Sequence, residues 1–336
     1  MSGQGAYIFG CEGRVLSAEE AGFFREANPW GFILFARNID TPQQLSTLTA
    51  ALREAVQRDA PIFIDQEGGR VERLRPPHWR DWLPPLEQVA QNKKGAARSM
   101  YLRYRLIADE LRAVGIDGNC SPVADIACAE THAILKNRCY GEDVVRVAEL
   151  AGIVAQAHLD GGVLPVIKHM PGLGRANLDS HEDLPRIKTK YKTLRHTDFM
   201  AFEPLAALPI AMTAHIIYED IDPHHPATQS PEVISLIRGE LDFGGLLMSD
   251  DINMSALTGD LAQRSRAALD AGCDMILQCN GQRADMQAVV GAAGTLSEVA
   301  QSRADAAIAC RCAPTPIDIP AVEAEFRALM TGEISG

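Results

Sequence analysis

The sequence predicts a single-domain (β/α)8 barrel of the TIM type, and three observations lead to this fold. Short apolar runs recur along the chain, amphipathic helical segments lie between them, and no Pro-, Gly- or Ser-rich linker divides the 336 residues. Runs that are apolar on both faces are typical of parallel strands covered by helices. Eight such units in one domain favour a closed barrel, with a doubly wound open sheet as the alternative.

The predicted strands are spaced so that a helix can follow each of them. They are Ala6–Phe9, Gly31–Phe35, Pro61–Ile64, Ile116–Asn119, Val163–Ile167, Ile210–Thr213, Gly244–Ser249 and Asp274–Gln278. The run Ile116–Asn119 is the weakest, since Asp117 and Gly118 interrupt its apolar character.

The helical segments are recognised from the spacing of their apolar residues. Segment 100–114 predicts one buried face of a helix that ends near Gly115, because its apolar residues recur every third or fourth position. A second helix is expected over Glu142–Leu159, with acidic residues in its first turn and Gly161 just after its end. We expect a helical extension from about residue 300 to residue 336, with Ala321–Met330 as its last helix.

The composition narrows the class of protein. A formal net charge of -12 argues against nucleic acid or an anionic membrane as a partner, since phosphate contacts need concentrated Lys and Arg. We expect no signal peptide and no membrane span, because the start is not basic and no apolar run approaches about 20 residues. The eight cysteines lack the spacing of a disulfide framework or a zinc site. We therefore expect a cytoplasmic protein without metal ion or cofactor. The sequence does not determine the oligomeric state, for which we expect a monomer.

Polar residues follow five of the predicted strands at the point where each strand ends. They are Asp65, Asn119, the pair Lys168-His169, His215 and Asp250. The C-terminal strand ends of such a barrel meet on one face, where active sites of this fold lie. Any one residue alone could be a structural hydrogen-bonding group, but buried charges without a task are costly. The pattern predicts a polar site at this face.

The loop after the fifth predicted strand adds a possible proton-transfer group. It is punctuated by Pro171, Gly172 and Gly174 and leads to Asp179-Ser180-His181. Histidine has an unperturbed pKa of about 6.5, so it suits proton transfer at neutral pH, and a carboxylate partner raises that pKa and fixes the tautomer. The alternative is a loop histidine beside an aspartate that forms an Asx turn.

Four motifs, in this order, resemble signatures of glycoside hydrolase family 3. They are IDQEGGRVERL (Ile64–Leu74), KHMPGLGRANLDSH (Lys168–His181), MTAHIIY (Met212–Tyr218) and MSDDINM (Met248–Met254). The resemblance is closest to the family's bacterial β-N-acetylglucosaminidases, which trim N-acetylglucosamine from cell-wall fragments, and it covers about Ala6–Asn280.

The resemblance implies a retaining glycosidase, which needs a nucleophile below the sugar ring and an acid/base beside the leaving oxygen. It implies that Asp250 is the nucleophile, with Asp251 as its rival, and that His181, held by Asp179, is the acid/base.

The resemblance also implies which residues hold the sugar hydroxyls. These ligand-holding residues are Asp65, Arg73, Arg138, Lys168 and His169. For Arg138 a surface salt bridge is the alternative. We expect Glu67 to brace the Gly68-Gly69 turn, and His215 and Met254 to line or support the pocket, with plain packing as the alternative for Met254.

The chain departs from the family at Leu173, where the family usually has histidine. We expect this change to disturb the placement of Asp179 and His181, so Leu173→His would raise turnover. The expected function is a cytoplasmic exo-β-N-acetylhexosaminidase that removes terminal N-acetylglucosamine from muropeptides in peptidoglycan recycling. The alternatives are a β-glucosidase of the same family, a phosphorylase that uses the same site, and a non-catalytic muropeptide-binding sensor.

Overall fold

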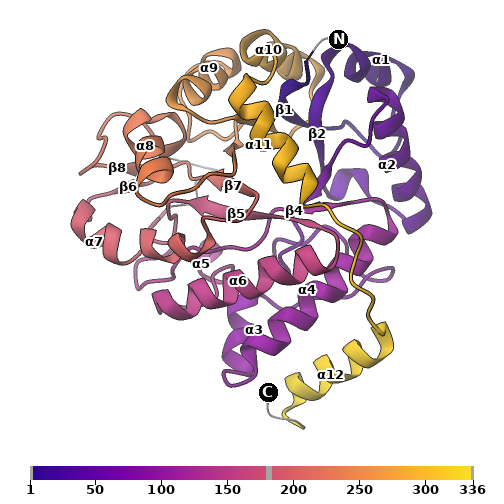
Figure 1. The fold of residues 1–336 in the computed structure, drawn as a ribbon, viewed down its shortest axis with the longest axis vertical. Helices are drawn as coiled ribbons and strands as arrows, with labels where there is room; N and C mark the ends of the chain where they lie inside the picture. The colour runs from indigo at the N-terminus through magenta and orange to yellow at the C-terminus, as the bar shows by residue number, and fades with distance from the viewer. Residues whose placement is uncertain (1–2, 179–183, 334–336) are drawn as a thin grey trace.

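The structure is a computed structural model that describes residues 3–178 and 184–333. Within these residues, eight parallel strands close into a barrel that is surrounded by helices, as the sequence pattern predicts (Figure 1). The barrel strands are β1 (Gly5–Gly10), β2 (Pro29–Leu34), β3 (Ile62–Ile64), β4 (Gly118–Asn119), β5 (Leu164–Met170), β7 (Ile210–Thr213), β9 (Leu246–Asp251) and β10 (Met275–Gln278). The barrel closes where β1 pairs with β10. Two short strands, β6 (Arg186–Ile187) and β8 (Ile217–Tyr218), pair outside it.

The helices cover the outside of the barrel (Figure 1). They are α1 (Ala18–Ala27), α2 (Pro42–Val56), α3 (Pro85–Gln91), α4 (Ala96–Ala113), α5 (Ala133–Lys136), α6 (Val144–Asp160), α7 (Tyr191–His196), α8 (Pro231–Gly239), α9 (Leu261–Ala271), α10 (Arg283–Ala293), α11 (Glu298–Ala309) and α12 (Ile319–Thr331). Short 3-10 turns occur at η1 (Ala36–Asn38), η2 (Phe199–Ala201), η3 (Glu203–Leu205) and η4 (Ala227–Gln229). None of the described helices combines the length and the apolar character that crossing a membrane requires.

The helices expected at residues 100–114 and 142–159 are confirmed as α4 and α6. The second begins two residues later than expected, because Asp143 is its N-cap and accepts a hydrogen bond from the backbone N–H of Arg146 at 2.8 Å. Gly161 ends this helix as its C-cap. The last helix, α12, packs on α4, and Phe326 on α12 meets Trp82 edge-on at a centroid distance of 5.6 Å.

The weakest of the predicted strands, β4, is only two residues long. A Cβ atom on Gly118 would lie 2.2 Å from the ring of Phe63, so that ring occupies the space of a side chain. The buried carboxylate of Asp117 pairs with Arg53 and with Arg311 at the start of this strand. The two residues that interrupt the apolar run therefore serve the packing and the charge balance of the barrel.

The inward-facing residues of the barrel form a buried apolar layer. This layer includes Ile8, Ile33, Phe63, Val166, Met212 and Met248. Side chains alternate between the two faces of a strand, so the residue two positions further along faces inward again. At the C-terminal ends, these next inward positions lie directly above the apolar layer.

Gly118→Ala is expected to lower the free energy of unfolding by about 1–3 kcal/mol, because the added methyl group overpacks the ring of Phe63. Gly291→Ala is the matched control, since Gly291 lies within α10 and a Cβ there meets nothing within 4 Å. That exchange is expected to stabilise the protein by about 0.4–1 kcal/mol. Urea denaturation of both variants measures whether the free energy of unfolding falls or rises. An equal change in the free energy of unfolding for the two variants would show that Phe63 does not exclude alanine at position 118.

Candidate active site

A pocket opens at the C-terminal ends of the barrel strands. It is lined by Ile33, Phe35, Asp65, Val71, Arg73, Arg138, Lys168, His169, Met212, Asp250, Asp251, Met254, Leu277 and Cys279. The structure thus brings together the five predicted ligand-holding residues, the predicted nucleophile and Met254.

Three of the charged lining residues follow an inward-facing apolar residue of their strand by two positions. Lys168 follows the buried Val166 by two residues on β5. Asp250 follows the buried Met248 by two residues on β9, and Asp65 stands above β3 in the same way. The alternation of strand side chains therefore points these groups into the pocket.

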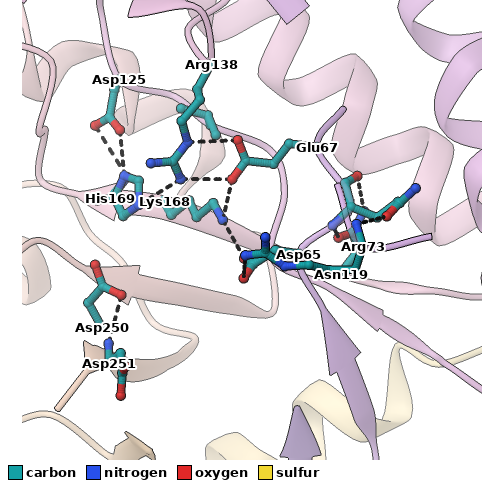
Figure 2. Close-up of polar contacts among 12 residues, drawn as sticks. Asp65, Glu67, Arg73, Asn119, Asp125, Arg138, Lys168, His169, Asp250 and Asp251 are labelled. Carbon is teal, nitrogen blue, oxygen red and sulfur yellow. Dashed lines mark hydrogen bonds and ion pairs between the residues drawn. The ribbon is translucent and has the colours of Figure 1, made fainter. Parts of the chain in front are cut away.

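The ammonium group of Lys168 is buried between two carboxylates, with 2% of the side chain exposed. Its Nζ donates to Oδ1 of Asp65 at 2.9 Å and pairs with Oε1 of Glu67 at 2.6 Å (Figure 2). Burial alone would lower the pKa of Lys168, but the two negative charges outweigh it and raise the pKa above its ordinary value.

Glu67 is held by Arg138 as well. The guanidinium donates from Nε to Oε2 at 2.9 Å and from Nη2 to Oε1 at 2.8 Å, a bidentate pair. Burial would raise the pKa of Glu67, but Arg138 and Lys168 lower it to about 2. The expectation that Glu67 braces the Gly68-Gly69 turn is therefore wrong for its side chain, which holds two cations. Arg138 forms no surface salt bridge with Glu67, since the Glu67 side chain is 0% exposed.

Arg73 contacts the other oxygen of Asp65. Its Nη2 donates to Oδ2 of Asp65 at 3.2 Å, and its guanidinium lies over the ring of Phe35, 5.5 Å from the centroid. Burial would raise the pKa of Asp65, but Lys168 and Arg73 together hold it well below its ordinary value. Asp65 is consequently ionised throughout the neutral pH range.

Asp125, which does not follow a predicted strand directly and belongs to none of the four motifs, is the partner of His169. Its Oδ2 lies 2.7 Å from Nδ1 of His169, and its side chain is 4% exposed. The available signal was a single acid within the otherwise apolar run 122–128, because a buried charge in such a run needs a partner. The peptide bond between Lys168 and His169 is cis, and both side chains line the pocket.

The two acids of the Ser-Asp-Asp motif occupy different environments. Oδ1 of Asp250 accepts the backbone N–H of Asp251 at 2.7 Å, and Asp250 lies across the pocket from the charged groups (Figure 2). Oδ1 of Asp251 accepts the backbone N–H groups of Asn253 at 3.2 Å and Cys279 at 3.1 Å. Burial and the neighbouring Asp250 raise the pKa of Asp251 to about 6, although the backbone contacts oppose this. Asp251 thus orients the turn that follows β9.

Asn119 and His215 support the pocket from outside its lining. The side-chain amide of Asn119 accepts the backbone N–H of Gln66 at 2.9 Å and donates to its carbonyl at 3.0 Å. Nε2 of His215 donates to the carbonyl of Asp251 at 3.1 Å, while Nδ1 contacts the hydroxyl of Thr228 at 2.8 Å. Burial lowers the pKa of His215. Both side chains therefore fix the backbone next to the charged residues.

The loop after β5 is described only to Leu178, so Asp179 and His181 lie outside the described residues. Leu173 is buried, with 1% exposed, and belongs to the hydrophobic core. A histidine that took the place of this side chain would be buried in the core, and the expectation that Leu173→His raises turnover stays a prediction. The loop is anchored by its backbone, because the N–H of Leu173 donates to Asp125.

Within residues 3–178 and 184–333, no group of three or more His, Cys, Asp or Glu side chains has the arrangement of a metal site.

Comparisons with known proteins support the family resemblance. A model of the glycosyl hydrolase family 3 N-terminal domain matches residues 16–310. The chain is 36% identical over 303 residues to a protein named Beta-hexosaminidase from Pseudomonas aeruginosa, which covers 89% of this chain and 90% of that protein. A Beta-hexosaminidase from Alkalilimnicola ehrlichii is 39% identical over 285 residues, with 82% and 81% covered.

Solved structures show the same architecture. NagZ from Neisseria gonorrhoeae, in complex with N-trifluoroacetyl-D-glucosamine, superposes with a TM-score of 0.83 at 27% identity, covering 98% of this chain and 97% of that one. A family 3 β-N-acetylglucosaminidase from a Paenibacillus species has a TM-score of 0.84 at 27% identity, covering 97% of this chain and 67% of the other.

Glu67→Gln is expected to destabilise the protein at pH 7 by roughly 3–5 kcal/mol, because it removes a carboxylate from two buried cations. The pKa of Glu67 falls from an ordinary 4.5 to about 2, so its contribution is present above pH 4.5 and is lost as the pH falls toward 2. The stability gap between wild type and variant should therefore narrow between pH 5 and pH 3, as measured by urea denaturation.

Glu54→Gln is the control for this exchange, since Glu54 is an exposed residue of α2. It is expected to change stability by less than about 0.5 kcal/mol at either pH. A Glu67→Gln gap that stays constant from pH 5 to pH 3 would contradict the assigned depression of the pKa of Glu67.

Proposed function

Because this chain belongs to glycosyl hydrolase family 3 and is a glycoside hydrolase, we propose that it is a retaining, exo-acting β-N-acetylhexosaminidase. Its substrate in this proposal is a muropeptide from which it removes terminal N-acetylglucosamine. The observation that carries the proposal is the meeting of the Asp250 carboxylate and a set of paired charged groups in one pocket. The relatives named Beta-hexosaminidase, and a structural neighbour that binds an N-acylated glucosamine, support this choice of sugar.

The proposed reaction begins at Asp250. Its carboxylate attacks the anomeric carbon as the glycosidic C–O bond breaks, and His181 gives its proton to the leaving oxygen. The sugar is then an ester of Asp250, while Asp179 holds the ring of His181. Neutral His181 takes a proton from a water molecule that attacks the same carbon. This step releases the sugar with retained configuration and restores the carboxylate of Asp250 and the proton of His181.

The opposite wall of the pocket supplies contacts for the sugar hydroxyls. Asp65 offers acceptor lone pairs, while Arg73, Arg138 and Lys168 offer N–H donors, and His169 adds an imidazole nitrogen. These groups are already held by one another before a ligand arrives. Such preorganisation reduces the entropy that binding would otherwise cost.

We further propose the setting in which this enzyme works. We place it in the cytoplasm as a monomer that recycles peptidoglycan fragments and needs no cofactor or metal ion. We also propose that residues 1–336 form one catalytic domain with a helical extension from about residue 300. The packing of α12 on α4 is consistent with that extension.

The test is release of nitrophenol from the 4-nitrophenyl β-glycosides of N-acetylglucosamine and glucose. Wild type is expected to hydrolyse the N-acetylglucosaminide, and Asp250→Asn to lower kcat by about 10⁴-fold or more, because the amide cannot form the ester intermediate. Asp242→Asn is the matched control, since Asp242 is exposed eight residues before Asp250 and its φ of 53° suits asparagine equally well. This control is expected to retain wild-type turnover.

Other outcomes identify the competing functions. Preferred turnover of the glucoside would indicate a β-glucosidase, and a sugar 1-phosphate formed in phosphate buffer would indicate phosphorolysis. Binding of N-acetylglucosamine that protects against heat, without turnover of either glycoside, would indicate a muropeptide-binding sensor.

A further inference from the structure

The carboxylate of Asp125 connects the wall of the pocket to the loop that follows β5. Its Oδ2 lies 2.7 Å from Nδ1 of His169, and its Oδ1 accepts the backbone N–H of Leu173 at 2.6 Å. The same Oδ1 lies 3.3 Å from the backbone nitrogen of His169. Asp125 comes from the segment after β4 and is buried, and Figure 2 shows its carboxylate beside the ring of His169.

The contacts of His169 determine which of its ring nitrogens carries the proton. Nε2 lies 3.4 Å from Nη2 of Arg138, and a guanidinium nitrogen can only donate. Nδ1 lies 2.7 Å from Oδ2 of Asp125, and a carboxylate can only accept, so Nδ1 carries the hydrogen and donates it. Nε2 is then an acceptor, which agrees with the N–H of Arg138 beside it. The ring is held with an acceptor nitrogen on the side of the pocket.

We propose that Asp125 is a positioning residue with two effects on the pocket. It fixes the Nδ1–H tautomer of His169, so that Nε2 can accept a hydrogen bond from a hydroxyl of the bound sugar in place of its long contact with Arg138, and it anchors the start of the loop through Leu173. The nature of the ligand rests on the proposed function. The tautomer and the anchor are properties of the protein itself.

The anchor at Leu173 does not require a polar side chain at this position. The hydrogen bond to Asp125 uses the backbone N–H, so it does not depend on the side chain. The loop has further polar contacts next to it, since Thr131 donates to the carbonyl of Gly174 and Arg175 donates to Asp198 at 2.7 Å. Three consecutive residues are thus each tied to a neighbouring segment of the chain.

Asp125→Asn tests the tautomer with almost no change in volume. An asparagine can keep an oxygen toward the N–H of Leu173, but its NH₂ group then faces Nδ1 of His169 and donates to it. The variant is therefore expected to switch His169 to the Nε2–H tautomer. Nitrogen NMR of the imidazole ring, assigned by comparison with His169→Gln, measures this switch. For the nitrophenyl N-acetylglucosaminide, kcat/KM is expected to fall by about 10- to 100-fold.

Asp198→Asn is the matched control, because Asp198 is also a buried acid that anchors the same loop through Arg175. It is expected to leave the His169 signals unchanged, since none of its described hydrogen bonds goes to that ring. A switch in both variants would overturn the inference, because the signal would then report a general loosening of the site.

The wild-type spectrum tests the inference even if Asp125→Asn does not fold. An Nδ1–H tautomer in wild type supports the proposal, and an Nε2–H tautomer overturns it. A folded Asp125→Asn protein that keeps the wild-type tautomer also overturns it. None of these readouts needs turnover, so a failure of the proposed hydrolase activity is distinguished from a failure of this inference.

Discussion

The buried ammonium group of Lys168 is the constraint on which the arrangement of the pocket depends. An unpaired charge that is removed from water costs several kcal/mol, and only 2% of this side chain is exposed. Asp65 and Glu67 supply the pairing, but two carboxylates beside one ammonium group require further positive charge. Arg73 supplies it to Asp65 and Arg138 supplies it to Glu67. Charge balance therefore determines how the two carboxylates and the two guanidinium groups are arranged around the ammonium group of Lys168.

The barrel separates these paired carboxylates from the acids of β9. Asp65 and Glu67 are held by cations, which lower the pKa of both and engage their oxygens. Asp250 stands across the pocket, on a strand whose inward residues below it are apolar. Asp251 points its oxygen at backbone N–H groups and fixes the turn. This division is consistent with one wall that holds a ligand and one carboxylate that reacts.

The supports of the pocket come from segments that are distant in the sequence. Glu67 and Arg138 are 71 residues apart, and Asp125 and His169 are 44 residues apart. The first contact joins two loops and the second joins a loop to β5, so the fold must close before either contact can form.

The sequence by itself determined the strands, the helices at α4 and α6, and the strand ends at which polar groups meet. It could do so because the period of apolar residues and the residue that ends each run are local properties. The tertiary structure decided the rest. Only in the folded chain does Glu67 contact two cations and His169 contact Asp125. The burial of Leu173 in the core is likewise a result of the tertiary structure. These facts depend on which loops meet above the barrel, and no local periodicity encodes such long-range pairs.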